Sequence, residues 1–145
     1  MEPMFAGKKG LVLGIANDFS IAWHIAKNLL EQGATIGFSH LPDKPEDERK
    51  KNRNRVAKCV EGHAGTKFLM PLDVSKDEDI AAIAARAKDE LGTLDFVLHS
   101  IAFASLDDLK RETIATSREG FKLAMDISVY SLLAVSNAVR PLMSN

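Results

Sequence analysis

The sequence has very little cysteine and no long apolar run, and each shortage excludes a class of protein. Cys59 is the only cysteine among 145 residues, which excludes an intramolecular disulfide and a cysteine-rich metal site. Such scarcity fits a reducing compartment, so we expect a cytoplasmic location. No apolar run approaches the roughly 20 residues that a membrane-spanning helix needs, so we expect no membrane as a partner.

An excess of charge of either sign is also lacking. The 19 basic and 20 acidic residues give a net charge of −1, and the basic stretch from Arg49 to Lys58 contains no aromatic residue that could stack on a base. We therefore expect no nucleic-acid partner. What is present, 46% hydrophobic and 27% charged residues, is typical of one globular domain with a real core.

No metal-ligand pattern is found either. The four histidines, His24, His40, His63 and His99, show no metal-binding spacing, and the sequence contains no H-E-x-x-H. We therefore expect no metal site. His99 ends an apolar run, and we interpret it as structural rather than catalytic.

Four short apolar runs alternate with segments of helical periodicity. The runs predicted to be strands cover residues 10–16, 34–40, 66–72 and 94–100. The first and last are almost continuously apolar, as expected of parallel strands that are covered on both faces. This alternation predicts an α/β protein with a Rossmann-like, doubly wound parallel sheet, and right-handed crossovers favour the strand order 3-2-1-4.

Helical signals fill the gaps between the strands. An amphipathic helix is predicted over residues 20–32, where Gly33 ends it, and a more polar helix runs from Pro45 to about Val60. Capping boxes at 75–78 and 116–119 predict the starts of two further helices. The apolar residues predicted to face inward in the last, long helix are Phe121, Ala124, Met125, Leu132, Val135 and Val139.

The turn after the first strand contains one glycine, where a dinucleotide-binding turn usually carries G-x-G-x-x-G. Gly14 lets the chain bend, and Ser20 can either cap the next helix or bond a phosphate oxygen. Ile21 and Ala22 then offer backbone N–H groups in the first helical turn. A βα turn without any ligand is an equal alternative on these residues alone.

Two other strand ends add to this site. Asp73 follows the third strand, where ligands bind in a doubly wound sheet, and its carboxylate can accept a hydrogen bond from an adenine amino group. The alternative is that Asp73 caps a helix. The fourth strand ends in His-Ser-Ile-Ala-Phe-Ala at 99–104, and the small residues there leave room for a ribose and a nicotinamide beside the sheet.

Together these segments resemble the enoyl-acyl-carrier-protein reductases of bacterial fatty-acid synthesis, a divergent branch of the short-chain dehydrogenase/reductases. GIANDFSIAWHIAK, which starts at Gly14, is similar to their variant cofactor turn, and the LDV at 72–74 is similar to their adenine-contact segment. LDFVLHSIAFA, from Leu94, resembles their strand-four signature, and TSREGFKLAMDISVYSLLAV, from Thr116, resembles the long helix that follows. The resemblance covers essentially the whole chain.

The resemblance implies reduction of a trans-2-enoyl thioester on acyl carrier protein with hydride from NADH, with NADPH as the alternative. NAD-selective sites often carry an acidic residue near the end of the second strand, where it binds the ribose 2′-OH. Here the first acidic residue after that strand is Asp43. Lys44, Arg49 and Lys50 could meet a 2′-phosphate, although we interpret them as a solvated helix face. The residues that the resemblance assigns to the cofactor are Gly14, Ser20 and Ile21 at the pyrophosphate, Asp73 and Val74 at the adenine, Ser100, Ile101 and Ala102 beside the ribose and nicotinamide, and Ile127 near the cofactor.

The family's catalytic tyrosine and lysine lie on a segment after a fifth strand. The only tyrosine, Tyr130, lies inside the predicted long helix and lacks the required lysine, so no catalytic residue is assigned. We expect residues 1–145 to form a single, incomplete NAD(P)-binding Rossmann domain that is truncated before strand five. Strand 94–100 should then be an apolar sheet edge.

We accordingly expect an N-terminal, cofactor-binding half of the enzyme that is inactive alone. Enoyl-acyl carrier protein is the expected partner of the full-length enzyme, and a homo-oligomer is the expected assembly. Two alternatives remain, a dinucleotide-binding fragment without catalysis and a short-chain reductase acting on another substrate.

Overall fold

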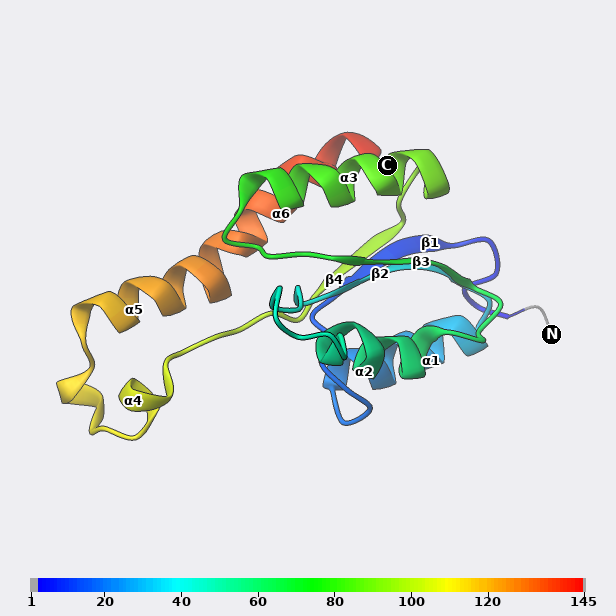
Figure 1. Ribbon diagram of the computed structural model, residues 1–145. Coiled ribbons are helices and arrows are strands. Elements are labelled where there is room, and N and C mark those ends of the chain that lie inside the picture. The colour runs from blue at the N-terminus through cyan, green and yellow to red at the C-terminus, as the bar shows by residue number, and fades with distance from the viewer. Residues whose placement is uncertain (1–2, 145) are drawn as a thin grey trace.

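The computed structural model describes residues 3–144, and a parallel four-stranded sheet forms its centre (Figure 1). Its strands are β1 (Lys9–Leu13), β2 (Thr35–His40), β3 (Thr66–Pro71) and β4 (Phe96–His99). They lie in the order β3-β2-β1-β4, and all three neighbouring pairs are parallel. The predicted doubly wound sheet and its strand order are confirmed.

Helices cover both faces of this sheet (Figure 1). Helices α1 (Ile21–Glu31) and α2 (Lys51–Val60) lie on one face, and α3 (Asp77–Leu91) and α6 (Ser131–Val139) lie on the other. Strand β1 contributes to both layers, because successive side chains of a strand point to opposite faces. Val12 packs in the cluster with α1 and α2, whereas Leu11 and Leu13 pack in the cluster with α3 and α6.

The polar second helix begins later than the sequence pattern predicts. It starts at Lys51, so the predicted start at Pro45 is wrong. The carboxylate of Asp43 accepts hydrogen bonds from the N–H groups of Asn52 at 2.6 Å and Arg53 at 3.2 Å. Asp43 therefore satisfies two free amides of the first helical turn from a distant loop position, and Asp47, which lies before the helix, accepts the Lys51 N–H at 3.3 Å.

The third helix forms as predicted, but its capping box does not. Helix α3 begins at Asp77, and its N-cap residue, Lys76, makes no side-chain cap. The Ser75 hydroxyl instead donates to Asp73 at 2.6 Å, and the Asp79 carboxylate accepts from the Asp73 N–H at 2.9 Å. The Ser75 hydroxyl is therefore bonded to an acidic side chain at the end of β3 and not to the amides of α3, so the predicted cap at Ser75 is wrong.

The predicted long helix is interrupted. It starts at Arg118, close to the predicted position, but the N-cap is Ser117, which accepts a hydrogen bond from the Gly120 N–H at 3.0 Å, so the predicted capping box that begins at Thr116 is wrong. Helix α5 (Arg118–Met125) then passes into a π-helical turn, η2 (Asp126–Tyr130), before α6 continues, and a 3-10 turn, η3 (Arg140–Leu142), follows. Two short elements precede α5, namely α4 (Leu106–Leu109) and η1 (Thr113–Ala115).

Only the second half of this interrupted helix packs on the sheet. Val135 and Val139 are buried as predicted, but Phe121 is 60% exposed, and Met125 and Leu132 are also exposed. Helix α5 extends beyond the end of the sheet together with α4 (Figure 1). The residues of α5 predicted to face inward therefore have no strand beneath them, and the prediction is wrong for Phe121 and Met125. It is also wrong for Leu132, which lies on α6.

The outer side of β4 is paired at one point. The Leu94 N–H donates to the Leu142 carbonyl at 2.7 Å, and the Ser144 N–H donates to the Leu94 carbonyl at 2.8 Å. Leu94 thus forms a parallel bridge with Met143 at the position that a fifth strand occupies in this kind of sheet. The expectation that the whole 94–100 edge is unpaired is therefore wrong at its first residue.

Candidate functional site

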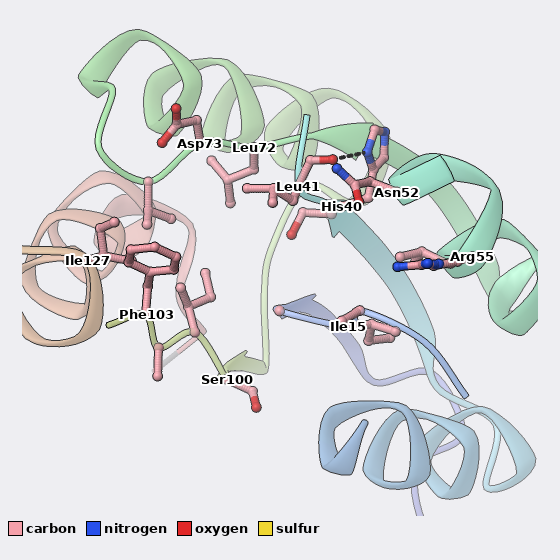
Figure 2. Close-up of a pocket in the computed structure, with 17 residues that line it drawn as sticks. Ile15, His40, Leu41, Asn52, Arg55, Leu72, Asp73, Ser100, Phe103 and Ile127 are labelled. Carbon is pink, nitrogen blue, oxygen red and sulfur yellow. Dashed lines mark hydrogen bonds between the residues drawn. The ribbon is translucent and has the colours of Figure 1, made fainter. Parts of the chain in front are cut away.

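A pocket lies at the carboxyl ends of the strands, where doubly wound sheets bind ligands (Figure 2). Figure 2 shows Phe103 and Ile127 together on one wall and His40, Asn52 and Arg55 on the opposite side. The predicted cofactor residues that line it are Gly14, Asp73, Val74, Ser100, Ile101, Ala102 and Ile127. The topology therefore brings residues from four separate stretches of sequence to one place.

Gly14 is positioned where β1 and β4 end side by side. Its φ of +101° lies in the left-handed region, and a Cβ at this position would collide with the carbonyl oxygen of Ser100. The Ser100 N–H also donates to the Leu13 carbonyl at 2.9 Å. Glycine is therefore required here by the close approach of two backbones, and this approach forms the floor of the pocket.

The turn before α1 leaves backbone donors free at the start of the helix. Ser20 is the N-cap residue by position, but its hydroxyl oxygen accepts from the N–H groups of Ala16 at 3.0 Å and Asn17 at 3.1 Å. Within the described part of the chain, the N–H groups of Ile21 and Ala22 have no acceptor. This end of α1 can therefore attract an anion. Ser20 and Ile21 do not line the pocket itself.

Asp73 is not the N-cap residue of α3, which is Lys76, but it stabilises the loop that leads to this helix. Its carboxylate accepts hydrogen bonds from the Ser75 N–H and hydroxyl, which fixes the loop that enters α3. These bonds, the hydroxyl first, and nearby Lys76 hold the pKa of the Asp73 carboxyl below its usual range. Asp73 is therefore anionic at neutral pH at the edge of the pocket, beside Leu72 (Figure 2).

The sequence patterns did not single out the polar side chains that β2 and α2 contribute. His40 is buried, and its Nδ1 donates to the Leu41 carbonyl at 2.9 Å. Asn52 and Arg55 line the pocket from α2, whereas Lys44, Arg49 and Lys50 do not. Their helical spacing is the sequence signal that could have found Asn52 and Arg55. Residues three apart share a helix face, and α2 follows the strand that ends at this edge of the sheet.

A hydrogen-bonded pair lies behind the wall formed by Ile127. The Nε2 of His99, at the end of β4, is 2.8 Å from the hydroxyl of Ser131 on α6. Burial lowers the pKa of the His99 imidazole below its ordinary value of 6.5, so the ring is neutral at neutral pH. His99 does not line the pocket, which agrees with its interpretation as a structural residue.

Across residues 3–144, no group of three histidine, cysteine, aspartate or glutamate side chains is arranged to hold a metal ion. In the same described range, no helix is both long and apolar enough to cross a lipid bilayer.

The comparisons with known proteins point to one family. The model of the family described as "Enoyl-(Acyl carrier protein) reductase" matches residues 14–145. The enoyl-[acyl-carrier-protein] reductase [NADH] FabI of Nostoc sp. is 44% identical over 138 residues, and that of Aquifex aeolicus is 41% identical over 140 residues. These alignments cover 95% and 97% of this chain but 52% and 49% of the relatives, so the chain spans about half their length.

Solved structures agree with these sequence matches. The crystal structure of the Aquifex aeolicus reductase (NADH) superposes with a TM-score of 0.87 at 41% identity, covering 98% of this chain and 59% of the other. The reductase from Anaplasma phagocytophilum in complex with NAD gives 0.87 at 36% identity, covering 100% of this chain and 53% of the other. By sequence and by fold, the chain belongs to the enoyl-acyl-carrier-protein reductase family.

Proposed function

We propose that this chain binds NADH as the cofactor-binding part of an enoyl-acyl-carrier-protein reductase. One observation carries the proposal, namely that Gly14, Asp73 and the 100–102 segment line one pocket at the carboxyl edge of the sheet. The relatives named above are NADH enzymes, and one related structure holds NAD. The bound cofactor supplies a hydride for a trans-2-enoyl thioester carried by acyl carrier protein.

The residues present fit a dinucleotide from end to end. The free amides of Ile21 and Ala22 at the start of α1 suit the pyrophosphate. The Asp73 carboxylate takes both Ser75 hydrogen bonds on Oδ1, so Oδ2 can accept an adenine amino group. Val74 would border the adenine, and the 100–102 segment with Ile127 would border the nicotinamide.

Binding is the part of the activity that we assign to these 145 residues. Charge develops on the thioester oxygen during hydride transfer, and a positioned donor is needed to stabilise it. Tyr130, the only tyrosine, is exposed on the π-helical turn and does not line the pocket. We therefore propose that this polypeptide on its own binds the cofactor as part of a single NAD(P)-binding domain and does not reduce enoyl thioesters.

We propose a cytoplasmic homo-oligomer as the working form. The exposed large apolar side chains on α5, the π-helical turn and α6, here named the α5–α6 face, are Phe121, Leu123, Met125, Val129, Tyr130, Leu132 and Leu133. Exposed apolar side chains in this number along one helical segment are unusual on a monomer and favour association. We propose that a second copy of the same chain covers this face in the homo-oligomer.

The test is a calorimetric titration of the purified chain with NADH. Ala102 is an exposed residue that lines the pocket, so Ala102→Trp should fill the site without disturbing the core. Ala82→Trp is the matched control, because Ala82 is exposed on α3 and lies outside the pocket. We expect saturable binding by the original chain and by Ala82→Trp, and its loss in Ala102→Trp. Failure of the original chain to bind NADH, or normal binding by Ala102→Trp, would refute the proposal.

A further inference from the structure

The π-helical turn η2 has an unusual hydrogen-bond pattern. The Ser131 N–H bonds to the carbonyl of Asp126, five residues earlier, instead of to the carbonyl four residues earlier. Turns of this width are rare and are frequent at functional sites. Here the turn carries Ile127, whose side chain lines the pocket, so the width of the turn sets the position of that wall.

The Ser131 hydroxyl closes this wide turn. It is 2.6 Å from the Ile127 carbonyl oxygen and 2.8 Å from Nε2 of His99. A carbonyl oxygen can only accept, so the hydroxyl donates its proton to Ile127 and accepts a hydrogen bond from His99. The proton of the neutral His99 ring is therefore on Nε2, and a directed chain of hydrogen bonds runs from His99 through Ser131 to Ile127.

A second connection joins the same two segments closer to the solvent. The Phe103 N–H donates to the Ser128 hydroxyl oxygen at 3.0 Å, and this hydroxyl lies 3.3 Å from the Phe103 carbonyl. Phe103 and Ile127 are neighbours on the same wall of the pocket in Figure 2. The stretch from the end of β4 to Phe103 is thus tied to the π-helical turn at both of its ends.

We propose that His99 and Ser131 are positioning residues that hold Ile127 and the 100–102 segment at the spacing required by the nicotinamide end of the cofactor. This inference rests on the proposed function. Neither residue lines the pocket, and Ser131 is fully buried, so the role that we propose for them is indirect. They act through the backbone of Ile127 and through the segment that directly follows His99.

Burial makes this pair sensitive to substitution. Ser131 is 0% exposed, so a partner that is lost there is not replaced by water. Ser131→Ala removes the donor to Ile127 and leaves the His99 N–H unsatisfied. His99→Leu removes only the donor to Ser131, whereas His99→Gln keeps a side-chain N–H of comparable reach.

The experiment compares NADH with ADP-ribose, which has the adenosine and pyrophosphate but no nicotinamide. Both ligands are titrated calorimetrically into the original chain, His99→Leu, His99→Gln and Ser131→Ala. We expect His99→Leu and Ser131→Ala to bind NADH about fivefold to tenfold more weakly, the effect of one lost hydrogen bond, and to bind ADP-ribose as the original chain does. His99→Gln should restore most of the NADH affinity that His99→Leu loses.

The ADP-ribose titration separates the possible failures. If the original chain binds neither ligand, the proposed function fails. If the original chain binds NADH and a variant loses affinity for both ligands equally, or for neither, His99 and Ser131 have no specific role at the nicotinamide end and the inference is overturned. Failure of His99→Gln to improve on His99→Leu would also contradict it.

Discussion

The carboxylate of Asp73 accepts two hydrogen bonds from Ser75, one from its N–H at 3.0 Å and one from its hydroxyl at 2.6 Å. Both bonds end on Oδ1, which leaves Oδ2 directed to Lys76 at 3.7 Å and free for a ligand. One side chain can therefore stabilise the α3 entry loop and also accept a hydrogen bond from the cofactor. Two substitutions can separate these roles.

We expect Asp73→Ala to weaken NADH binding by about 1–2 kcal/mol and also to lower thermal stability. Ser75→Ala removes the hydroxyl hydrogen bond and leaves both the Ser75 N–H bond and the carboxylate in place, so it should lower stability alone. Calorimetry and a thermal melt of both variants provide the measurement. Equal NADH affinities in the two variants would show that Asp73 serves only the loop.

Gly14→Ala should unfold the chain or reduce its stability strongly. The residue has positive φ, and its Cβ would collide with the Ser100 carbonyl. Gly62→Ala is the control, because Gly62 has a φ of +92° with nothing within 4 Å of the added Cβ. The control should lose about 1–3 kcal/mol of unfolding free energy, the cost of backbone strain alone. Urea denaturation measures both, and equal losses would exclude the collision as a cause.

The stability of the chain should depend on His99 at mildly acidic pH. Burial lowers the pKa of its imidazole in the folded state below the unfolded value near 6.5. Below pH 6.5 the unfolded chain therefore takes up a proton that the folded chain does not, and stability falls with pH until the folded pKa is passed. Urea denaturation should give a loss between pH 7.5 and 5.5 that is smaller in His99→Gln. Identical losses in both proteins would contradict this reasoning.

The purified chain should elute from a size-exclusion column above its monomer mass of 15.9 kDa. Leu133, on the α5–α6 face, is 63% exposed, and Leu133→Glu should shift elution toward the monomer. Leu109→Glu is the matched control, because Leu109 is equally accessible but belongs to α4. If Leu109→Glu dissociates the assembly and Leu133→Glu does not, another surface forms the contact.

We expect no consumption of NADH when the chain is mixed with crotonyl thioester. A single donor to a developing oxyanion is worth about 100- to 1,000-fold in rate, and the pocket described here holds no tyrosine. Absorbance of NADH at 340 nm provides the assay, with a full-length reductase of the family as the positive control. Turnover at the rate of that control would show that these residues alone complete the catalytic site.

The sequence by itself determined the sheet and the general location of the site. Strands covered on both faces must be apolar along their whole length, so β1 was recognisable, and right-handed crossovers then left few possible strand orders. Because the carboxyl ends of parallel strands meet at one edge, the sequence alone predicts that Gly14, Asp73 and Ser100 lie together.

Only the tertiary structure decided which helix faces are buried and which distant polar groups meet. The apolar pattern of α5 predicted an inward face, but α5 lies beyond the end of the sheet (Figure 1), and its Phe121 is exposed. The contact between His99 and Ser131 joins residues 32 positions apart. Local patterns reflect the preferences of neighbouring residues, whereas such a contact depends on where two separate parts of the backbone pass each other in the folded chain.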